Sequence, residues 1–457
     1  MIDFKKISEY SKSGPRYTSY PTAVEFHSGF DNQKFKQALV RNDENKNTPL
    51  SLYVHLPFCS SACYFCACSV IYTKSEDKKE RYLQFLEKEF SLLKKSMNTH
   101  REVVQLHFGG GTPTYFSAHQ LDRVIKLVHN TFDNFASNAE VSCEIDPRFF
   151  NEDHMRVLKN GGFNRISFGV QDFDERVQKA INRFQSIELM QQVVKIARDY
   201  NIFSINFDLI YGLPLQTLQS FKETLKKSVD LMPDRFAIFN YAHVPWIKKT
   251  MGNINEKDLP TPEEKLEILK YTIEFLSSCG YKMIGMDHFA KEDDELYIAS
   301  QKGELRRNFQ GYTTKGFSQT IGIGLTSIGE GIDYYAQNFK DMQQYEDAID
   351  RGILPIERGI DLSFDDILRK EVIMQLMNNA RLLFHKIEKK YNINFKEYFS
   401  KELEVLRNFE KDLLLEIRKD GIFVNSTGGM LIRNIAMCFD AYLEKIPLEQ
   451  RRFSKTI

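Results

Sequence analysis

Four cysteines within ten residues are the feature of this sequence that most clearly predicts chemistry. Cys59, Cys63, Cys66 and Cys68 lie in one short segment, and only three other cysteines occur among the 457 residues. Thiolates gathered so closely bind zinc or an iron–sulfur cluster. Zinc ribbons usually draw two cysteine pairs from separate segments, and the sequence has no second pair. The spacing C-x3-C-x2-C suits three irons of a 4Fe–4S cluster with the fourth iron left open, and a zinc loop remains the alternative.

The elements that must position these cysteines follow a regular alternation of strands and helices. Apolar, β-branched runs predict strands at 50–56, 103–108, 139–145, 164–169, 203–209 and 235–241, and helical patterns lie near 76–97, 117–132, 151–160, 186–200 and 217–231. Such a repeat predicts an α/β fold with parallel strands and right-handed crossovers. Six units form an open, incomplete (β/α)6 barrel, whereas a closed barrel needs eight. The cysteines directly follow the first strand, at the face where barrel active sites are built.

The pattern divides the chain into three expected domains. Residues 1–48 form an N-terminal extension with a short helix near 32–42, and residues 49–340 form the partial barrel with its cysteine loop at 59–68. A helix at 262–278 and a further strand at 281–287 belong to this second domain. From 341 to 457 strand signals fade and helices near 363–379, 400–419 and 430–444 predict a smaller, mainly helical domain.

Two further features suit a ligand at the same barrel face. A glycine-rich stretch, GGGTPT from Gly109 to Thr114, follows the second strand, and its glycines let the backbone approach a ligand closely. It lacks the lysine of a phosphate-binding loop, which excludes the nucleoside triphosphate interpretation. Glu144 and Asp208 lie near strand ends, where carboxylates suit a ribose diol or an ammonium group. A helix cap or a salt bridge would explain the same two residues structurally.

Composition excludes several classes of protein. Lysine plus arginine and aspartate plus glutamate both number 62, so the chain lacks the basic excess of a nucleic-acid coat or an anionic-membrane binder. The sequence has no run of 18 apolar residues of the kind that predicts a membrane span. The first 22 residues lack the apolar segment of a secretory signal. Clustered thiols without such a signal fit a reducing compartment, so we expect a cytoplasmic protein.

The motifs together resemble one known family. The C-x3-C-x2-C segment, with Phe65 before its last cysteine, looks like the signature of radical S-adenosylmethionine (SAM) enzymes. Seven further stretches narrow the resemblance to the oxygen-independent coproporphyrinogen III oxidases. They are RYTSYPT (16–22), GGGTPT (109–114), GVQDF (169–173), DLIYGLP (208–214), FNYAH (239–243), GMDHFA (285–290) and NFQGYTT (308–314), and the similarity reaches NIAMCFDAYL (434–443).

This resemblance implies a reaction and its cofactors. In the family, the three cysteines Cys59, Cys63 and Cys66 ligate a 4Fe–4S cluster, and SAM chelates the open iron. Reductive cleavage of SAM gives a 5′-deoxyadenosyl radical, which takes a hydrogen atom from a propionate side chain of coproporphyrinogen III. Loss of carbon dioxide and an electron leaves a vinyl group, and two rounds give protoporphyrinogen IX in haem biosynthesis. The family also implies a radical-SAM barrel, a monomer, and reduced flavodoxin or ferredoxin as the electron donor.

The resemblance assigns further residues to two bound SAM molecules. Glycines and a threonine of GGGTPT would meet the SAM amino group, and two residues would surround a second SAM molecule. Four more would line the two sites through packing or backbone contacts, and the two carboxylates would hold polar groups of SAM. The expected set is Tyr53, Phe65, Gly110, Gly111, Thr112, Glu144, Gln171, Arg183, Asp208, Ala242 and Ile328.

A substrate with four carboxylates requires positive charge at its site. We name five candidates for its propionates, and we expect RYTSYPT to lie near the substrate because it is dense in aromatic and hydroxyl groups. Each candidate has a surface charge as its structural alternative. The five are Arg16, Arg165, Arg306, Arg307 and Lys315.

Two other classes of protein compete with the oxidase. A haem chaperone related to radical SAM enzymes would bind haem without oxidase activity, but such chaperones usually lack RYTSYPT and Cys68. A protein for plain electron transfer would use all four clustered thiolates and would leave GGGTPT, Glu144 and Asp208 unexplained. We do not count Cys68 as an iron ligand.

Overall fold

The structure is a computed structural model that describes residues 2–10, 12–45, 48–445 and 453. It divides into two compact units. Unit 1 comprises residues 1–25, 276–316 and 362–457, and unit 2 comprises residues 26–275 and 317–361. None of the described helices combines the length and the apolar character needed to cross a membrane.

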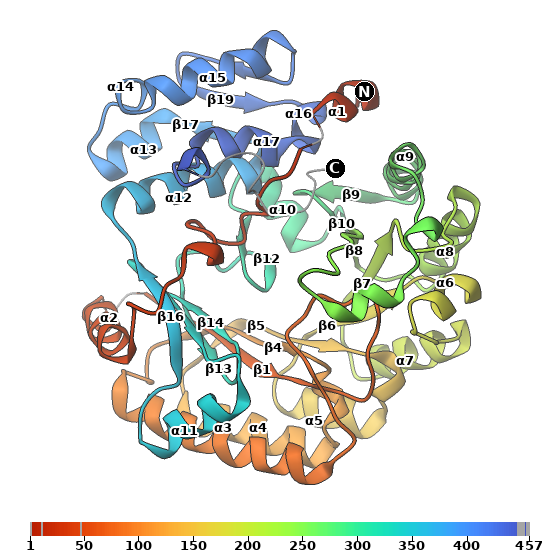
Figure 1. Ribbon diagram of the computed structural model, residues 1–457, viewed down its shortest axis with the longest axis vertical. Coiled ribbons are helices and arrows are strands. Elements are labelled where there is room, and N and C mark those ends of the chain that lie inside the picture. Colours follow the sequence, from red (N-terminus) through yellow and green to blue (C-terminus); the bar gives the residue numbers. More distant parts are fainter. Residues whose placement is uncertain (1, 11, 46–47, 446–452, 454–457) are drawn as a thin grey trace. The chain divides into compact units, whose positions relative to one another are not determined.

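Unit 2 contains the six strand–helix units that the sequence predicts. Its parallel strands follow the order β1 (Leu50–Leu56), β4 (Val103–Gly110), β5 (Phe135–Ile145), β6 (Arg165–Gln171), β7 (Ser204–Tyr211) and β8 (Arg235–Asn240). The helices between them are α3 (Glu76–Ser96), α4 (Ala118–Thr131), α5 (Glu152–Asn160), α6 (Glu175–Ala180), α7 (Ile187–Asp199) and α8 (Leu218–Asp230), with α9 (Pro262–Ser278) after β8. Figure 1 shows α3, α4 and α5 along one side of β1, β4 and β5. The α/β class and the (β/α)6 arrangement are confirmed.

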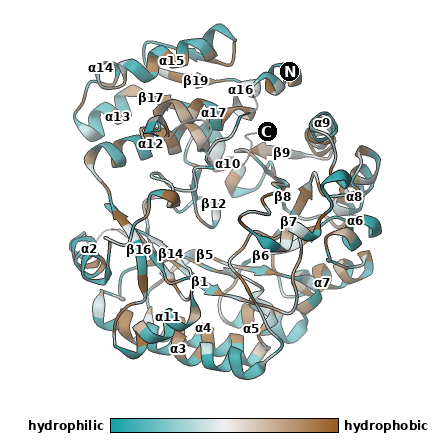
Figure 2. Ribbon diagram, in the orientation of Figure 1, coloured by the Kyte–Doolittle hydropathy of each residue, from teal (hydrophilic) through white to brown (hydrophobic). Residues whose placement is uncertain are grey.

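Local sequence explains why these elements form where they do. Every residue of β4 is buried, as expected of a parallel strand covered on both faces. Helix α4 begins at a capping box, in which Ser117 and Gln120 bond each other's backbone N–H groups. Its buried residues recur at helical spacing, as at Leu121, Val124 and Val128. Figure 2 shows the same mixture of hydrophilic and hydrophobic residues along the covering helices.

A second set of strands extends the sheet beyond β1. Strand β13 (Gln319–Ile323) pairs parallel to β1, and β14 (Ile328–Glu330), β15 (Tyr334–Asn338) and β16 (Ile356–Asp361) continue antiparallel. Unit 2 also includes α2 (Asn32–Glu44) and α11 (Met342–Asp350). The sequence pattern predicts no strand after residue 287. These strands are short and contain glycines such as Gly322 and Gly329, so they lack the long β-branched runs on which strand prediction depends.

The C-terminal part of unit 1 is mainly helical, as expected, and unit 1 also contains short strands. It contains α1 (Phe4–Glu9), α10 (Glu295–Lys302), α12 (Phe364–Asn379), α13 (Phe384–Tyr391), α14 (Phe395–Tyr398), α15 (Ser400–Lys411), α16 (Ser426–Met430) and α17 (Ile432–Ala436). A small antiparallel sheet has the order β17 (Arg381–Leu383), β19 (Gly421–Val424), β18 (Leu415–Ile417). The predicted helix 400–419 was therefore too long. It ends at Lys411, because the chain turns into the β18–β19 hairpin.

The predicted strand 281–287 is a hairpin of two strands. Strands β9 (Tyr281–Ile284) and β10 (His288–Lys291) pair antiparallel around Gly285, whose φ of 61° suits glycine. A second hairpin joins β11 (Arg306–Asn308) to β12 (Gly311–Thr313). The two units interleave along the chain, whereas the sequence analysis proposed three consecutive domains. The difference arises because residues 1–25 and 276–316 cluster with the C-terminal residues.

Candidate functional site

The cysteine loop follows the carboxyl end of β1, and strand pairing holds its two ends together. Strands β2 (Phe58–Cys59) and β3 (Ile71–Tyr72) pair parallel and bring the two ends of the loop together. Within the loop, Tyr64 N–H donates to the Ile181 carbonyl at 3.0 Å, and Asn182 Nδ2 donates to the Ala62 carbonyl at 2.7 Å. These bonds join the cysteine loop to the turn after α6.

The glycines of GGGTPT let β4 end directly against this loop. A Cβ on Gly111 would lie 2.7 Å from the carbonyl oxygens of both Pro57 and Phe58, which are backbone atoms that cannot rotate away. Gly111 N–H donates to the Leu56 carbonyl, and Thr112 N–H donates to that of Phe58. Gly110 has a φ of 120°, a conformation that favours glycine. The sequence-predicted residues Gly110, Gly111 and Thr112 therefore lie beside the cysteine loop.

The thiols of the loop influence one another electrostatically. Burial raises the pKa of Cys59 to about 12, and the Thr112 hydroxyl at 3.4 Å partly offsets this. The pKa of Cys66 is lowered to about 7, chiefly by a hydrogen bond from the Cys68 thiol and in smaller part by the charges of Lys248 and Arg183, which together outweigh its burial. Cys68 therefore acts on a neighbouring thiol in this structure.

Two arginines face Cys63 from opposite elements. Arg148 Nη2 lies 3.7 Å and Arg183 Nη1 lies 3.8 Å from the Cys63 Sγ. Both guanidinium groups share the carboxylate of Asp146, each at 2.7 Å from its Oδ2. Arg183 also donates to the Gly169 carbonyl at 2.7 Å. Two guanidinium groups against one carboxylate leave a net positive charge beside the thiols.

This donor set fits an iron–sulfur cluster. Three cysteines of one loop supply the thiolates that such clusters use, and net positive charge stabilises a group made of thiolates and sulfides. Among residues 2–10, 12–45, 48–445 and 453, no three His, Cys, Asp or Glu side chains have the arrangement of a single-ion site. A cluster of four irons is larger than one ion, so its thiolates lie further apart.

Glu144 and Tyr53 lie on neighbouring strands at the same end of the sheet. His107 Nε2 bonds Glu144 Oε1 at 3.2 Å, and the Tyr53 and His107 rings stack with centroids 5.9 Å apart. Burial raises the pKa of Glu144, but the bonds from His107 and the Gly110 N–H outweigh it, so the pKa is lowered overall. A Cβ on Gly109 would lie 3.0 Å from Glu144 Oε2, so glycine leaves this carboxylate room.

His55 fixes the orientation of the Tyr53 hydroxyl. Burial lowers the pKa of His55 to about 4, so its ring is neutral at pH 7. Its Nε2 lies 3.0 Å from the Ser69 carbonyl, which can only accept, so Nε2 carries the proton. Nδ1 then accepts from the Tyr53 hydroxyl at 2.9 Å. This chain of bonds joins β1 to the far end of the cysteine loop.

The polar residues of β6 and β7 form a second group. Ser167 Oγ donates to Asp208 Oδ2 at 3.0 Å, and Asn206 Nδ2 donates to Asp208 Oδ1 at 2.8 Å. Gln171 ends β6 with a φ of 67°, a strained value for a residue other than glycine. The lack of a Cβ on Gly169 leaves space for the side chains of Gln171 and Arg183.

The remaining predicted residues are apolar. Phe65 packs against a core cluster that includes Val177, Ile181 and Ile210, so it also has a structural role. Ala242 lies just beyond the carboxyl end of β8, and Ile328 begins β14. The backbone of Ile328 lies so close to β13 that a Cβ on Gly322 would meet it at 2.7 Å.

The candidate basic residues do not form one group. In unit 2, Arg165 pairs with the buried Glu140 at 2.8 Å. In unit 1, Arg16 and Arg307 lie together beside Asp287, and Arg306 on the same strand lies near Gly316. Lys315 follows Thr313, whose hydroxyl accepts from the Lys315 N–H.

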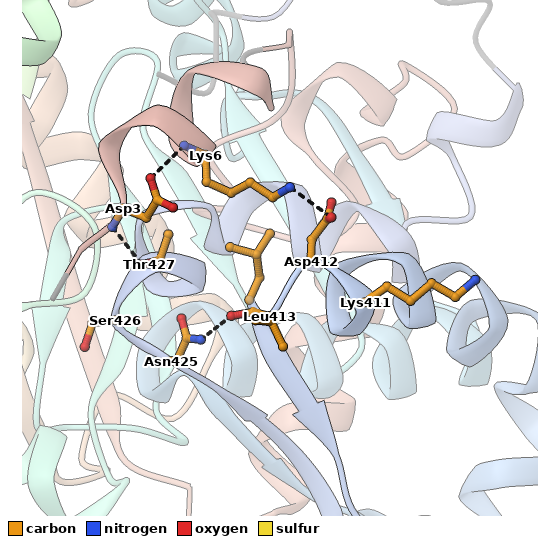
Figure 3. A pocket seen from close by; sticks show the side chains of 9 residues that line it. Asp3, Lys6, Lys411, Asp412, Leu413, Asn425, Ser426 and Thr427 are labelled. Carbon is orange, nitrogen blue, oxygen red and sulfur yellow. Dashed lines mark hydrogen bonds and ion pairs between the residues drawn. The ribbon is translucent and has the colours of Figure 1, made fainter.

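A cavity of about 580 Å³ in unit 1 contains none of the predicted site residues. Figure 3 shows its lining, which comes from α1 and from the end of α15 to α16. Lys6 there donates to Asp412 at 2.9 Å, and the Asp3 carboxylate caps the Lys6 N–H. Lys411 also lines the cavity, so its charged lining combines two lysines with two aspartates.

Sequence reasoning missed Asp146, Arg148 and His107. Asp146 and Arg148 directly follow β5, and position at the carboxyl end of a strand was a signal that could have identified them. His107 lies within the buried strand β4, and only the pairing of β4 with β5 brings it to Glu144.

Comparison with known proteins adds an independent finding. The profile of the Radical SAM superfamily matches residues 53–227. The chain is 60% identical to an oxygen-independent coproporphyrinogen III oxidase of Helicobacter pylori strain J99, over all of this chain and 99% of that protein. It is 46% identical to the oxidase of the same name from Escherichia coli, over all of this chain and 98% of that one. A solved structure of coproporphyrinogen III oxidase (HemN) from Escherichia coli, described as a radical SAM enzyme, matches with a TM-score of 0.92 and 45% identity over 97% of this chain and 99% of that chain.

Proposed function

The chain belongs to the family of oxygen-independent coproporphyrinogen III oxidases, and we propose that the residues around its cysteine loop carry out that family's reaction. It is a radical SAM oxidoreductase of porphyrin biosynthesis. The reaction is the oxidative decarboxylation of two propionate side chains of coproporphyrinogen III to vinyl groups, which gives protoporphyrinogen IX. The single observation that carries this function is similarity along the whole chain, rather than over the barrel alone.

We assign the 4Fe–4S cluster to Cys59, Cys63 and Cys66. When bound, the cluster and SAM supply one-electron cleavage to a 5′-deoxyadenosyl radical, which removes a hydrogen atom from the propionate. The paired arginines beside Cys63 support this assignment, because their positive charge stabilises a cluster built of negatively charged thiolates and sulfides. Cys68 donates to Cys66 and is not counted as a ligand.

The neighbouring polar groups suit SAM. The backbone of Gly110, Gly111 and Thr112 lies against the cysteine loop, and the ionised Glu144 suits the ribose hydroxyls or the ammonium of SAM. We propose a second SAM molecule near Gln171, Arg183 and Asp208. Support for it is the strained backbone of Gln171 and the space at Gly169, because strain of this kind is often kept at ligand sites.

The haem chaperone is the weaker alternative. The relatives that match over the whole chain carry oxidase names, and the chain retains RYTSYPT and Cys68. We further propose reduced flavodoxin or ferredoxin as the electron donor, a monomeric state and a cytoplasmic location. A low-potential donor is required because the cluster must be reduced before SAM is cleaved.

Anaerobic turnover with defined variants tests the proposal. The reconstituted protein, supplied with SAM, a low-potential reductant and coproporphyrinogen III, should release carbon dioxide and 5′-deoxyadenosine. Serine at Cys59, Cys63 or Cys66 should abolish both products and lower the bound iron, whereas Cys68→Ser should keep its cluster. Formation of 5′-deoxyadenosine without decarboxylation would exclude the oxidase.

A further inference from the structure

Three arginines of unit 1 gather around one carboxylate. Arg16 Nη1 lies 3.6 Å from Asp287 Oδ2, and Arg307 Nη1 donates to the Arg16 carbonyl at 3.3 Å. Arg433 donates through Nε to the Pro15 carbonyl at 3.0 Å, one residue before Arg16. The three come from the N-terminal segment, from β11 and from α17, which are far apart in sequence.

The backbone contacts fix this group in place. Arg433 also donates to the Gly14 carbonyl, so it holds the segment that carries Arg16. Tyr17, the next residue, is buried with a φ of 47°, and its hydroxyl donates to Asp440 at 2.8 Å. The Arg16 side chain is 37% exposed and thus accessible to a ligand.

The local field is positive despite the carboxylate. His288 Nδ1 lies 2.7 Å from Asp287 Oδ1, so Asp287 already interacts with a histidine as well as with Arg16. Burial lowers the pKa of Arg433 to about 9, and the positive charge of Arg16 lowers it by more than Asp287 raises it. Arg307 lowers it as well. A further anion beside these arginines would relieve their mutual repulsion.

The Arg307 guanidinium carries a buried donor for which the described residues supply no acceptor. Its Nε is buried and has no hydrogen-bond partner among the described residues, and the Oε1 of Gln310 in the adjoining turn is likewise without one. The guanidinium carbon lies 5.2 Å from the centre of the Tyr312 ring, which fixes the plane of the group. A buried charged donor without an acceptor is costly, so a ligand oxygen there would be stabilising.

We propose that Arg16 and Arg307 bind a carboxylate of the substrate, with Arg433 as the positioning residue that holds the Arg16 backbone. This inference rests on the proposed function, which supplies a ligand with four carboxylates. The guanidinium fork of arginine matches a carboxylate in two parallel bonds, which a lysine cannot reproduce. The site would therefore recognise the propionate groups and not the macrocycle.

The test measures binding of coproporphyrin III, the oxidised porphyrin with the same four carboxylates, by its fluorescence with the reconstituted protein. Arg307→Gln and Arg16→Gln should each weaken binding by about tenfold or more, since a charged hydrogen bond is lost. Arg418→Gln is the matched control. Arg418 also belongs to unit 1, but its side chain is exposed and pairs with Glu416 at 2.7 Å, so binding should not change. The tetramethyl ester, which lacks the charges, should bind weakly to the wild type and equally to all variants.

The outcomes separate this inference from the proposed function. Equal affinity of all three variants for coproporphyrin III would overturn the arginine site, even if wild-type turnover is intact. Equal affinity of the wild-type protein for coproporphyrin III and for its tetramethyl ester would also overturn the arginine site. Failure of wild-type turnover with coproporphyrinogen III would instead reject the function. Arg307→Lys should recover only part of the affinity, and unchanged circular dichroism would exclude misfolding as the cause.

Discussion

Gly111 is a residue at which an added Cβ should displace the cysteine loop. In Gly111→Ala the new Cβ would lie 2.7 Å from two backbone oxygens of the segment that leads into the cysteine loop. The loop would have to move, so we expect loss of bound iron and at least a hundredfold fall in turnover, about 3 kcal/mol. Iron content and 5′-deoxyadenosine release measure both effects. Gly252→Ala is the control, since nothing lies within 4 Å of its added Cβ and activity should not change.

Arg183 is the residue whose geometry lysine cannot replace. It bonds Asp146 and the Gly169 carbonyl, each at 2.7 Å, and is almost fully buried. In Arg183→Lys one partner loses its bond, and we expect the free energy of unfolding to fall by about 2–3 kcal/mol together with a higher KM for SAM. Chemical denaturation and steady-state kinetics measure these. Arg176→Lys, at an exposed pair with Asp174, should change neither; equal losses in the two variants would contradict this role.

At the scale of single residues, the sequence predicts a site residue where the spacing alone carries the information. Cys59, Cys63 and Cys66 could be selected because three thiols in eight residues have few structural explanations. Arg148 and Asp146 carried only the weaker signal of a position just after a strand, and the fold is what brings Arg148 to Cys63 and pairs it with Asp146. The arginine group around Asp287 depends on three distant segments, so no local pattern reveals Arg433.

At the scale of elements, the turn after α6 holds the cysteine loop. Asn182 has a φ of 53°, which suits asparagine, and donates to the Ala62 carbonyl. Asn182→Ala should remove that bond and strain the turn, so the free energy of unfolding should fall by about 1–2 kcal/mol. Iron should also be released faster to a chelator. Asn201→Ala is the control, because Asn201 has a φ of 56° in the turn after α7, away from the loop. Equal rates of iron release in both variants would contradict the role of the turn.

A buried carboxylate joins α3 to the β13–β14 turn. Glu89 accepts from the Gly324 N–H at 2.8 Å, from Asn338 at 2.7 Å and from the Tyr345 hydroxyl at 2.6 Å. Burial raises its pKa to about 7 from an ordinary value near 4.5. The folded state thus holds a proton that the unfolded chain loses above about pH 4.5, so this stability is lost as the pH rises toward 7.

The pH dependence of unfolding checks this carboxylate. Between pH 5.5 and 8, we expect the wild type to lose about 2 kcal/mol relative to Glu89→Gln, which cannot titrate there. Urea denaturation of both proteins at several pH values measures the difference. A constant difference across this range would show that Glu89 is ionised at both ends of it.

Element prediction succeeded for the barrel and failed for short strands. The barrel strands β1, β4, β5, β6, β7 and β8 have six to eleven residues each. Strand β1 matches its predicted bounds at 50–56. Strands β13 to β19 have three to six residues each, so their burial patterns are too short to recognise. The turn at Gly285 divides a run that reads as one strand.

At the scale of the whole molecule, segments that are far apart in the sequence belong to the same compact unit. Residues 1–25 belong with 276–316 and 362–457, so RYTSYPT shares a unit with NFQGYTT and not with the cysteine loop. Deletion of residues 1–24 removes Arg16 and should abolish binding of coproporphyrin III while leaving the cysteine loop's iron in place. Porphyrin fluorescence and iron analysis of the same sample measure the two results. Unchanged porphyrin binding would show that the N-terminal segment is not part of the substrate site.

The most direct test of the central claim follows a hydrogen atom from substrate to cofactor. Coproporphyrinogen III carrying deuterium in its propionate side chains would be turned over anaerobically with SAM and a low-potential reductant, and the 5′-deoxyadenosine analysed by mass spectrometry. We predict 5′-deoxyadenosine that contains deuterium, formed together with carbon dioxide and a vinyl product. Release of carbon dioxide with 5′-deoxyadenosine free of deuterium would contradict removal of the propionate hydrogen by the SAM-derived radical.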